Sequence, residues 1–107
     1  MNEPSEGRIL GWIMAQVRIA IPEFYFWRAN RGAMQTKSGY VEFGAVGQSD
    51  ILGVLYGRFI AIEVKSKTGR QSTDQCAFQE KIESAGGVYI IARTPADVIS
   101  TLRKLIS

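Results

Sequence analysis

Apolar residues recur at the spacing of one helical face in three stretches of the chain, which predicts three helices. These stretches are residues 4–20, with Leu10, Ile13 and Val17 on the stripe; residues 73–85, which end before Gly86-Gly87; and residues 95–106. Paired glycines after the second stretch favour a helix end at that point. Pro95 suits the first turn of the third helix, where a missing backbone N–H has no cost.

The remaining apolar runs predict strands. Residues 24–28 are aromatic, and residues 49–66 form two apolar runs separated by Tyr56-Gly57, a plausible two-residue hairpin turn. Residues 88–92 are almost wholly apolar, which predicts a strand in the interior of the sheet with both faces buried. Residues 30–48 carry four glycines and are expected to form a long loop, a feature that is more often functional than filler.

The predicted order is helix, three strands, helix, strand, helix, which indicates an α/β fold. Both faces of the predicted hairpin carry apolar residues, so helices should cover a mixed sheet on both sides. A chain of 107 residues is long enough for one core, and we expect residues 1–107 to form a single domain.

Counting back from the predicted turn places Asp50 directly opposite Glu63 on the neighbouring strand. Facing residues of paired strands have Cβ atoms about 4.5–5.5 Å apart, and alternation puts Lys65 on the same face as Glu63. Two carboxylates and an ammonium are therefore predicted to converge on one patch of an apolar sheet.

Composition narrows the chemistry of that patch. The chain has no histidine and one cysteine, which removes His-dependent catalysis and the common zinc sites. A metal would have to be held by oxygen, which favours Mg²⁺, Mn²⁺ or Ca²⁺. No apolar run reaches the roughly 20 residues of a membrane span, and the first residues do not resemble a signal peptide, so a cytoplasmic location is expected.

The two carboxylates have different alternatives. Asp50 either caps a turn with Ser49 or is a metal ligand, since Asp is disfavoured inside a strand. Glu63 interrupts an apolar run, and a buried carboxylate needs a partner, which is either Lys65 or a cation. A divalent ion held by Asp50, Glu63 and the backbone carbonyl of Val64 fits Mg²⁺ chemistry. Lys65 would then orient or deprotonate the attacking water, or stabilise charge on a phosphate.

Two further polar residues are candidates. Glu6 shares the stripe of the first helix, and is either a first-turn acid favoured by the helix dipole or a third carboxylate near the metal. Gln75 either closes a capping box with Ser72 or hydrogen-bonds to Lys65 or to a phosphate.

The net charge of +3 is compatible with a nucleic-acid partner without establishing one. The basic residues gather in two stretches of the chain, which are either DNA contacts or solvated loops. The candidate DNA contacts are Arg28, Asn30, Arg31, Lys37, Lys67 and Arg70.

An Asp at one strand end and a Glu-x-Lys on the next strand resemble the PD-(D/E)xK nuclease superfamily. Over nearly the whole chain, the sequence is similar to its virus-type replication-repair nuclease (VRR-NUC) family. The strings that carry this resemblance are Arg28-Ala29-Asn30-Arg31-Gly32-Ala33, Phe43-Gly44-Ala45-Val46-Gly47-Gln48-Ser49-Asp50-Ile51, Ile62-Glu63-Val64-Lys65, Asp74-Gln75 with Phe78, and Gly86-Gly87. The proline of the superfamily name is absent, since Ser49 precedes Asp50.

The resemblance implies a restriction-endonuclease-like αβββαβ core and a DNA nuclease that depends on Mg²⁺ or Mn²⁺. It implies that Asp50, Glu63 and Lys65 are catalytic, and Glu6 and Gln75 match the acid of the first helix and the glutamine that follows the motif. Small stand-alone members, from phages or bacteria, resemble Holliday junction resolvases and tend to be homodimers. No organic cofactor and no membrane partner are expected. The alternatives are a less selective endonuclease or nickase, and a DNA-binding assembly module without catalysis.

Overall fold

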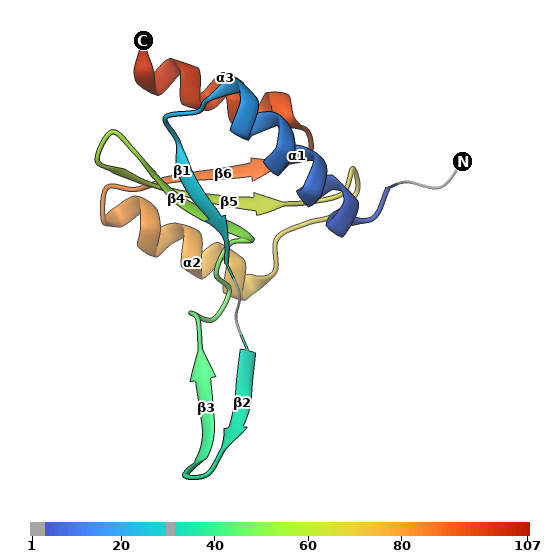
Figure 1. Cartoon of the computed structure of the whole chain (residues 1–107), viewed down its shortest axis with the longest axis vertical. Helices are drawn as coiled ribbons and strands as arrows, with labels where there is room; N and C mark the ends of the chain where they lie inside the picture. Colours follow the sequence, from blue (N-terminus) through green and yellow to red (C-terminus); the bar gives the residue numbers. More distant parts are fainter. Residues whose placement is uncertain (1–3, 30–31) are drawn as a thin grey trace.

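The computed structural model describes residues 4–29 and 32–107, and Figure 1 shows their arrangement. In chain order the elements are α1 (Glu6–Ala20), β1 (Tyr25–Arg28), β2 (Gly32–Thr36), β3 (Gly39–Phe43), β4 (Ile51–Leu55), β5 (Arg58–Val64), α2 (Thr73–Ser84), β6 (Val88–Ala92) and α3 (Pro95–Ile106). The three predicted helices and the four predicted strands are all present, with bounds that differ from the expected ones by a few residues.

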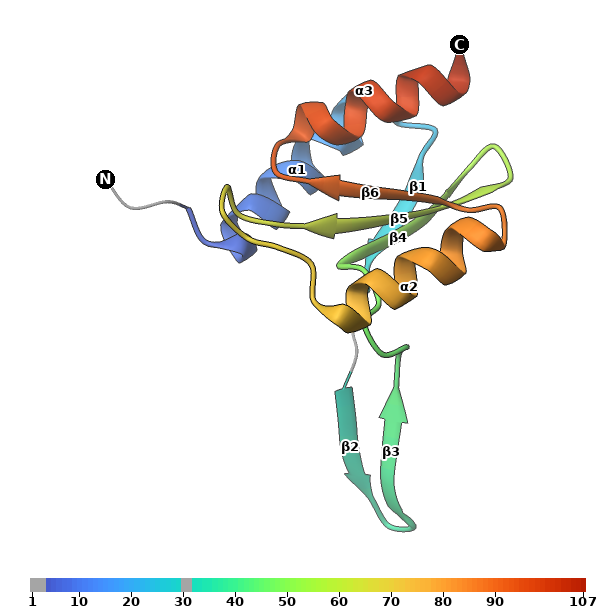
Figure 2. The same ribbon diagram turned by 180° about the vertical axis from the view of Figure 1, so that it is seen from behind.

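A four-stranded sheet in the order β1-β4-β5-β6 forms the centre of the fold. The pairs β1–β4 and β4–β5 are antiparallel, whereas β5 and β6 are parallel, so the sheet is mixed. Helices α1 and α3 cover one face and α2 covers the other, as the two opposite views in Figures 1 and 2 show. The prediction of a mixed α/β fold with helices on both sides of the sheet is therefore confirmed.

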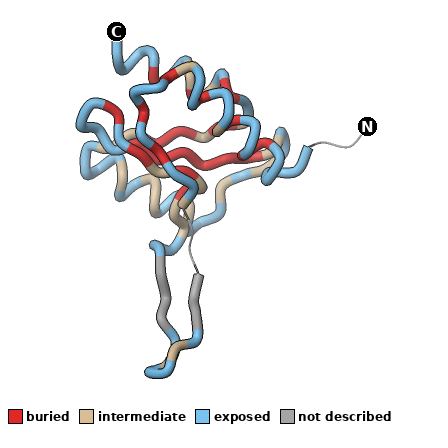
Figure 3. Tube along the Cα trace, viewed as in Figure 1, coloured by how far each residue is buried: buried red, intermediate tan, exposed pale blue. Residues whose placement is uncertain are grey.

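The core lies between the sheet and the pair α1 and α3. Helix α1 buries Ile9, Leu10, Ile13 and Val17, three of which belong to the stripe read from the sequence. Figure 3 shows buried positions along the central strands and on the helix faces that contact them. Full burial of such a side chain contributes about 1.5–3 kcal/mol, so this face accounts for much of the stability of the fold.

The β4–β5 hairpin has the predicted turn and register. Tyr56 and Gly57 have φ angles of 48° and 80°, the positive values that a type I′ turn requires at both positions. Leu55 pairs with Arg58 and Ile51 pairs with Ile62. The same register, extended by one residue, places Asp50 opposite Glu63.

The prediction of a long loop over residues 30–48 is wrong in part, because β2 and β3 pair there as an antiparallel hairpin. This hairpin projects from the body of the molecule in both views (Figures 1 and 2). Gly39 opens β3 directly after the turn and has a φ of 123°, and the Thr36 hydroxyl donates to the Gly39 carbonyl at 2.7 Å. A glycine that indicated a loop thus stands where a tight turn passes into the second of two short strands.

The expected interior position of residues 88–92 is also wrong, since β6 is an edge strand of the sheet. Its apolar sequence has another cause: α3 and α2 both contact this strand, from opposite faces of the sheet. Burial of both faces by helices produces the same pattern as an interior position.

No helix in the described part of the chain is both long enough and apolar enough to span a membrane.

Candidate metal centre

Asp50 stands at the entrance of β4 and is held from two sides. Its backbone carbonyl accepts a hydrogen bond from the Ala29 amide at 2.8 Å, just after β1. Its Oδ2 accepts from the Val64 amide, also at 2.8 Å, at the far end of β5. The Asp50 carboxylate therefore reaches across the hairpin toward the end of β5, as the register argument predicted, and its bond to Val64 does not cap a local turn.

Glu63 lies on β5 with an exposed fraction of 3%. Its Oε2 accepts a hydrogen bond from Gln75 Nε2 at 3.1 Å and lies 3.6 Å from Lys65 Nζ. Its Oε1 is buried and has no hydrogen-bond partner. One oxygen is thus fully engaged, whereas the other lacks the donor that a buried carboxylate oxygen requires.

The pKa of Glu63 is raised to about 8, first by burial and then by the nearby Asp50 carboxyl group, while the Lys65 ammonium acts in the opposite direction. Two ionised carboxylates only accept hydrogen bonds, so they cannot satisfy each other. The pair becomes favourable when a proton is shared between the two groups or when a cation lies between them. The electrostatics of this site therefore favour the capture of a positive charge.

Lys65 follows β5 directly and is buried, with 8% of its surface exposed. Its amide donates to the Ala92 carbonyl at 3.0 Å, which continues the parallel pairing with β6 and fixes the backbone at this point. The ammonium forms the ion pair with Glu63, so the expected convergence of two acids and a lysine is present. This ion pair uses the Glu63 oxygen that Gln75 also contacts, and leaves Oε1 unpaired.

Gln75 performs two tasks at once. Its Oε1 accepts from the Ser72 amide at 2.9 Å and its own amide donates to the Ser72 hydroxyl at 3.1 Å, so the predicted capping box is present. Its Nε2 donates to Glu63. The amide donates to the Glu63 carboxylate and not to Lys65, and the cap holds it in place, while a hydrogen bond to a phosphate stays a prediction.

Glu6 begins α1 and is exposed, so its expected place on the buried stripe of the helix is wrong. Its Oε2 accepts from the Ser66 amide at 3.4 Å. It nevertheless borders the carboxylate pair, because a cavity of about 90 Å³ is lined by Glu6, Gly7, Leu10, Arg28, Asp50 and Val64. Val64, the expected carbonyl ligand, and Arg28, an expected DNA contact, line the same cavity.

Within residues 4–29 and 32–107, no three Asp, Glu, His or Cys side chains come close enough together to hold a metal ion. The expected third carboxylate is therefore not gathered with Asp50 and Glu63. The pair itself fits a hard divalent cation, because both groups offer oxygen and the buried Oε1 of Glu63 lacks a partner.

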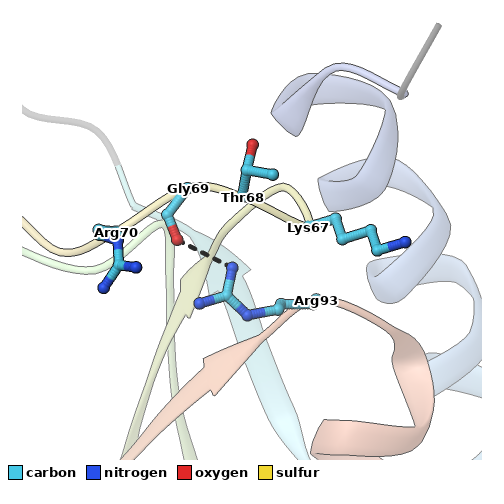
Figure 4. Close-up of a pocket in the computed structure, with 5 residues that line it drawn as sticks. All are labelled: Lys67, Thr68, Gly69, Arg70 and Arg93. Carbon is cyan, nitrogen blue, oxygen red and sulfur yellow. Dashed lines mark hydrogen bonds between the residues drawn. The ribbon is translucent and has the colours of Figure 1, made fainter.

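The other basic candidates lie on separate parts of the surface. Lys37 is exposed between β2 and β3, whereas Lys67 and Arg70 are exposed on the loop that follows Lys65. Asn30 and Arg31 lie outside the described residues. Lys67, Thr68, Gly69 and Arg70 line one pocket together with Arg93 (Figure 4).

Arg93 was missed by the sequence analysis. Its Nη1 donates to the carbonyls of Ser66 and Gly69, the latter at 2.9 Å, and so supports the loop after Lys65. The signal in the sequence was a cationic residue directly after a buried strand. Because β6 runs parallel to β5, Arg93 at the end of β6 lies beside the loop that follows β5, and this pairing was not predicted.

Searches against models of known protein families and against curated proteins found no match to this chain.

Proposed function

We propose that this chain is a divalent-metal-dependent DNA endonuclease, similar to the VRR-NUC members of the PD-(D/E)xK superfamily, with a restriction-endonuclease-like core. One observation carries the proposal: Asp50 and Glu63 meet at one end of the β4–β5 hairpin, and a buried oxygen of Glu63 has no partner. The element order supports it, because α1, β1, β4, β5, α2 and β6 follow the order αβββαβ once the β2–β3 hairpin is set aside as an insertion.

Asp50 and Glu63 would hold Mg²⁺ or Mn²⁺, with the Val64 carbonyl as a further ligand. Such a cation supplies Lewis-acid chemistry for phosphodiester hydrolysis. Glu6, at the edge of the same cavity, would contribute through a water molecule.

The remaining residues position groups and move protons. Glu63, whose raised pKa favours its protonated form, would release that proton to solvent when a cation binds, and Gln75 keeps the carboxylate oriented through Oε2. Lys65, next to that oxygen, orients the attacking water and stabilises negative charge on the phosphate. Hydrolysis needs each of these groups within reach of one phosphate, and all of them come from the end of β5 or from segments that contact it.

DNA is the proposed substrate, with a four-way junction as the favoured form. A homodimer with two-fold symmetry would present one site to each of two strands. Arg28 lines the cavity beside Asp50, where it would contact the phosphate backbone on approach. The cytoplasm of a bacterium or of a phage host is the proposed location.

A cleavage assay tests this function. The purified protein is given labelled four-way junction, flap, nicked duplex and linear duplex with Mg²⁺ or Mn²⁺. We expect cleavage that requires the metal and that falls about 100-fold or more in Asp50→Ala and Lys65→Ala. Lys81→Ala, which removes an exposed lysine from the last turn of α2, is the matched control and should cut at the normal rate.

The outcomes separate the alternatives. If the folded protein cleaves none of the substrates, the nuclease function is wrong, and the alternative of a DNA-binding module without catalysis remains. Equal cleavage of all four substrates would contradict selectivity for junctions and favour the less selective endonuclease. Normal activity in Asp50→Ala or Lys65→Ala would show that the site is wrongly placed.

A further inference from the structure

Two pockets adjoin each other beside the loop that follows Lys65, and they differ in character. The first, of about 330 Å³, is the basic pocket of Figure 4, to which Lys67 and Arg70 bring exposed cationic side chains. The second, of about 260 Å³, is lined by Pro4, Ile9, Trp12, Lys67, Arg93 and Thr94. Because Lys67 and Arg93 line both pockets, the surface runs from a cationic end to an apolar, aromatic end.

This surface borders the candidate metal centre. A Cβ atom added to Gly69 would lie 2.9 Å from Glu6 Oε2 and 3.4 Å from Lys65 Cδ. The Ser66 amide donates to the same carboxylate of Glu6, which in turn lines the cavity beside Asp50. The loop of residues 66–70 therefore borders the basic pocket and also contacts Glu6, which lines the cavity beside Asp50.

The loop has a defined shape because Arg93 supports it from below. The guanidinium donates to the carbonyls of Ser66 and Gly69, so one cation of the basic pocket is occupied by the loop backbone. In Figure 4 the side chain of Lys67 extends toward α1, whereas Arg70 lies at the other end of the loop. Lys67 and Arg70 are the cations of this surface that are left to meet a ligand.

Trp12 is the aromatic residue of the second pocket, and 52% of its surface is exposed. It lies on α1 one turn beyond Ile9, which lines the same pocket and is buried in the core. An exposed indole beside cationic side chains is the combination that proteins use to bind single-stranded nucleic acid. Bases stack on the ring, and the cations meet the phosphates.

We propose that these two pockets bind an unpaired DNA strand next to the cleavage site, with a nucleobase stacked on Trp12 and phosphates contacted by Lys67 and Arg70. The proposal rests on the nuclease function above and narrows its substrate to branched DNA with unpaired bases next to the cut, as in a flap or in a four-way junction opened at its crossover. A continuous duplex keeps its bases in the stack and offers no free face to Trp12.

A binding experiment in EDTA, where the proposed nuclease cannot cut, tests the site. The probes are one duplex with a five-nucleotide dT tail and the same duplex with a tail of abasic sites. The abasic tail keeps the phosphates and lacks the bases. We expect the native chain to bind the dT tail about tenfold more tightly, since stacking of one base contributes about 1–3 kcal/mol.

Variants separate the contribution of base stacking from that of the phosphate contacts. Trp12→Ala should bind both tails equally, and Trp12→Phe should keep part of the preference for dT. Trp27→Ala is the matched control, because Trp27 is 43% exposed on β1 and lines neither pocket, and it should retain the full preference. Lys67→Ala should weaken binding of both tails alike and make it less sensitive to salt.

The proposal is overturned if the native chain binds the two tails equally, or if folded Trp12→Ala keeps the preference for dT. Both results are read without cleavage. If the native chain prefers the dT tail but cuts no DNA in Mg²⁺, the strand-binding site stands and the proposed nuclease function is overturned. If it cuts DNA but binds both tails with equal affinity, the nuclease function stands and the strand-binding site is overturned.

Discussion

Glu63 is a buried carboxylate whose ionised form is unfavourable in its surroundings. Its burial on a central strand raises its pKa, and the nearby Asp50 carboxyl group acts in the same direction. Lys65 and Gln75 both act on Oε2, so they do not relieve the unpartnered Oε1. A bound proton or cation at this oxygen would remove the cost, which makes protonation and metal binding compete for the same place.

The raised pKa predicts how stability depends on pH in the absence of metal. The folded chain holds a proton on Glu63 up to about pH 8, whereas the ordinary value of 4.5 applies to the unfolded chain. This contribution to the free energy of unfolding is complete below pH 4.5 and is lost as the pH rises through 8. The slope is at most about 1.4 kcal/mol per pH unit. Urea unfolding in EDTA across this range measures it.

Glu63→Gln is the control for that slope, because the amide imitates the protonated acid and does not titrate. The variant should lose most of the decline between pH 5 and 8, and should gain no stability from Mg²⁺ or Mn²⁺. The native chain should regain stability at pH 8 when the metal is added. An equal pH slope in both proteins would show that Glu63 titrates normally.

Residue types in this site were readable from the sequence, but their partners were not. A carboxylate inside an apolar strand predicted a buried, partnered Glu63 without naming the partner. Gln75 matched both a capping box and a functional role, and the structure shows both the cap and a bond to Glu63. Glu6 was assigned to a helix stripe by spacing alone, yet it lies in the exposed first turn, where the stripe has not yet met the sheet.

At the scale of elements, the segment before β4 is positioned by its contact with α2. Gly47 has a φ of 74°, and a Cβ atom there would lie 2.2 Å from the backbone oxygen of Asp74. The segment that leads to Asp50 thus rests on the first turn of the helix that carries Gln75. This contact ties the two sides of the site together.

Gly47→Ala should therefore disturb the site as well as the fold. We expect the free energy of unfolding to fall by about 2 kcal/mol or more, because the new Cβ atom is strained by the positive φ and clashes with backbone. Displacement of Asp50 should lower metal affinity and cleavage together. Urea unfolding, metal titration and the cleavage assay measure the three effects.

Gly57→Ala is the matched control for strain without a clash. Gly57 has a φ of 80°, but nothing lies within 4 Å of an added Cβ atom. The Gly57→Ala variant should lose about 1 kcal/mol of its free energy of unfolding and keep its metal affinity. Equal effects of both substitutions on metal affinity would mean that the contact with Asp74 does not position Asp50.

At the scale of the whole molecule, the β2–β3 hairpin stands outside the four-stranded sheet that the other strands form (Figures 1 and 2). Its strands pair with each other, and Gly32 faces Phe43 where it leaves the body. Facing residues of an antiparallel pair lie about 5 Å apart, so a short linker can close the gap.

Replacement of residues 32–43 by a two-residue Gly-Ser linker should leave the fold intact. We expect the melting temperature to change by only a few degrees, because the core residues whose burial the structure describes lie outside the replaced segment. Thermal unfolding followed by circular dichroism measures this, with the native chain as the reference. Loss of cooperative unfolding would show that the hairpin contributes to the core.

The sequence by itself determined the helices, the β4–β5 hairpin, its register and the pairing of Asp50 with Glu63. These follow from local rules: helical spacing, a turn with positive φ, and alternation along a strand. Tertiary structure decided what depends on contacts between distant segments. These contacts place β6 at the edge of the sheet and leave β2 and β3 as a separate hairpin. They also bring Gln75 to Glu63 and Trp12 into the same pocket as Lys67. Such contacts depend on which segments the packed core brings together, and no local pattern specifies this.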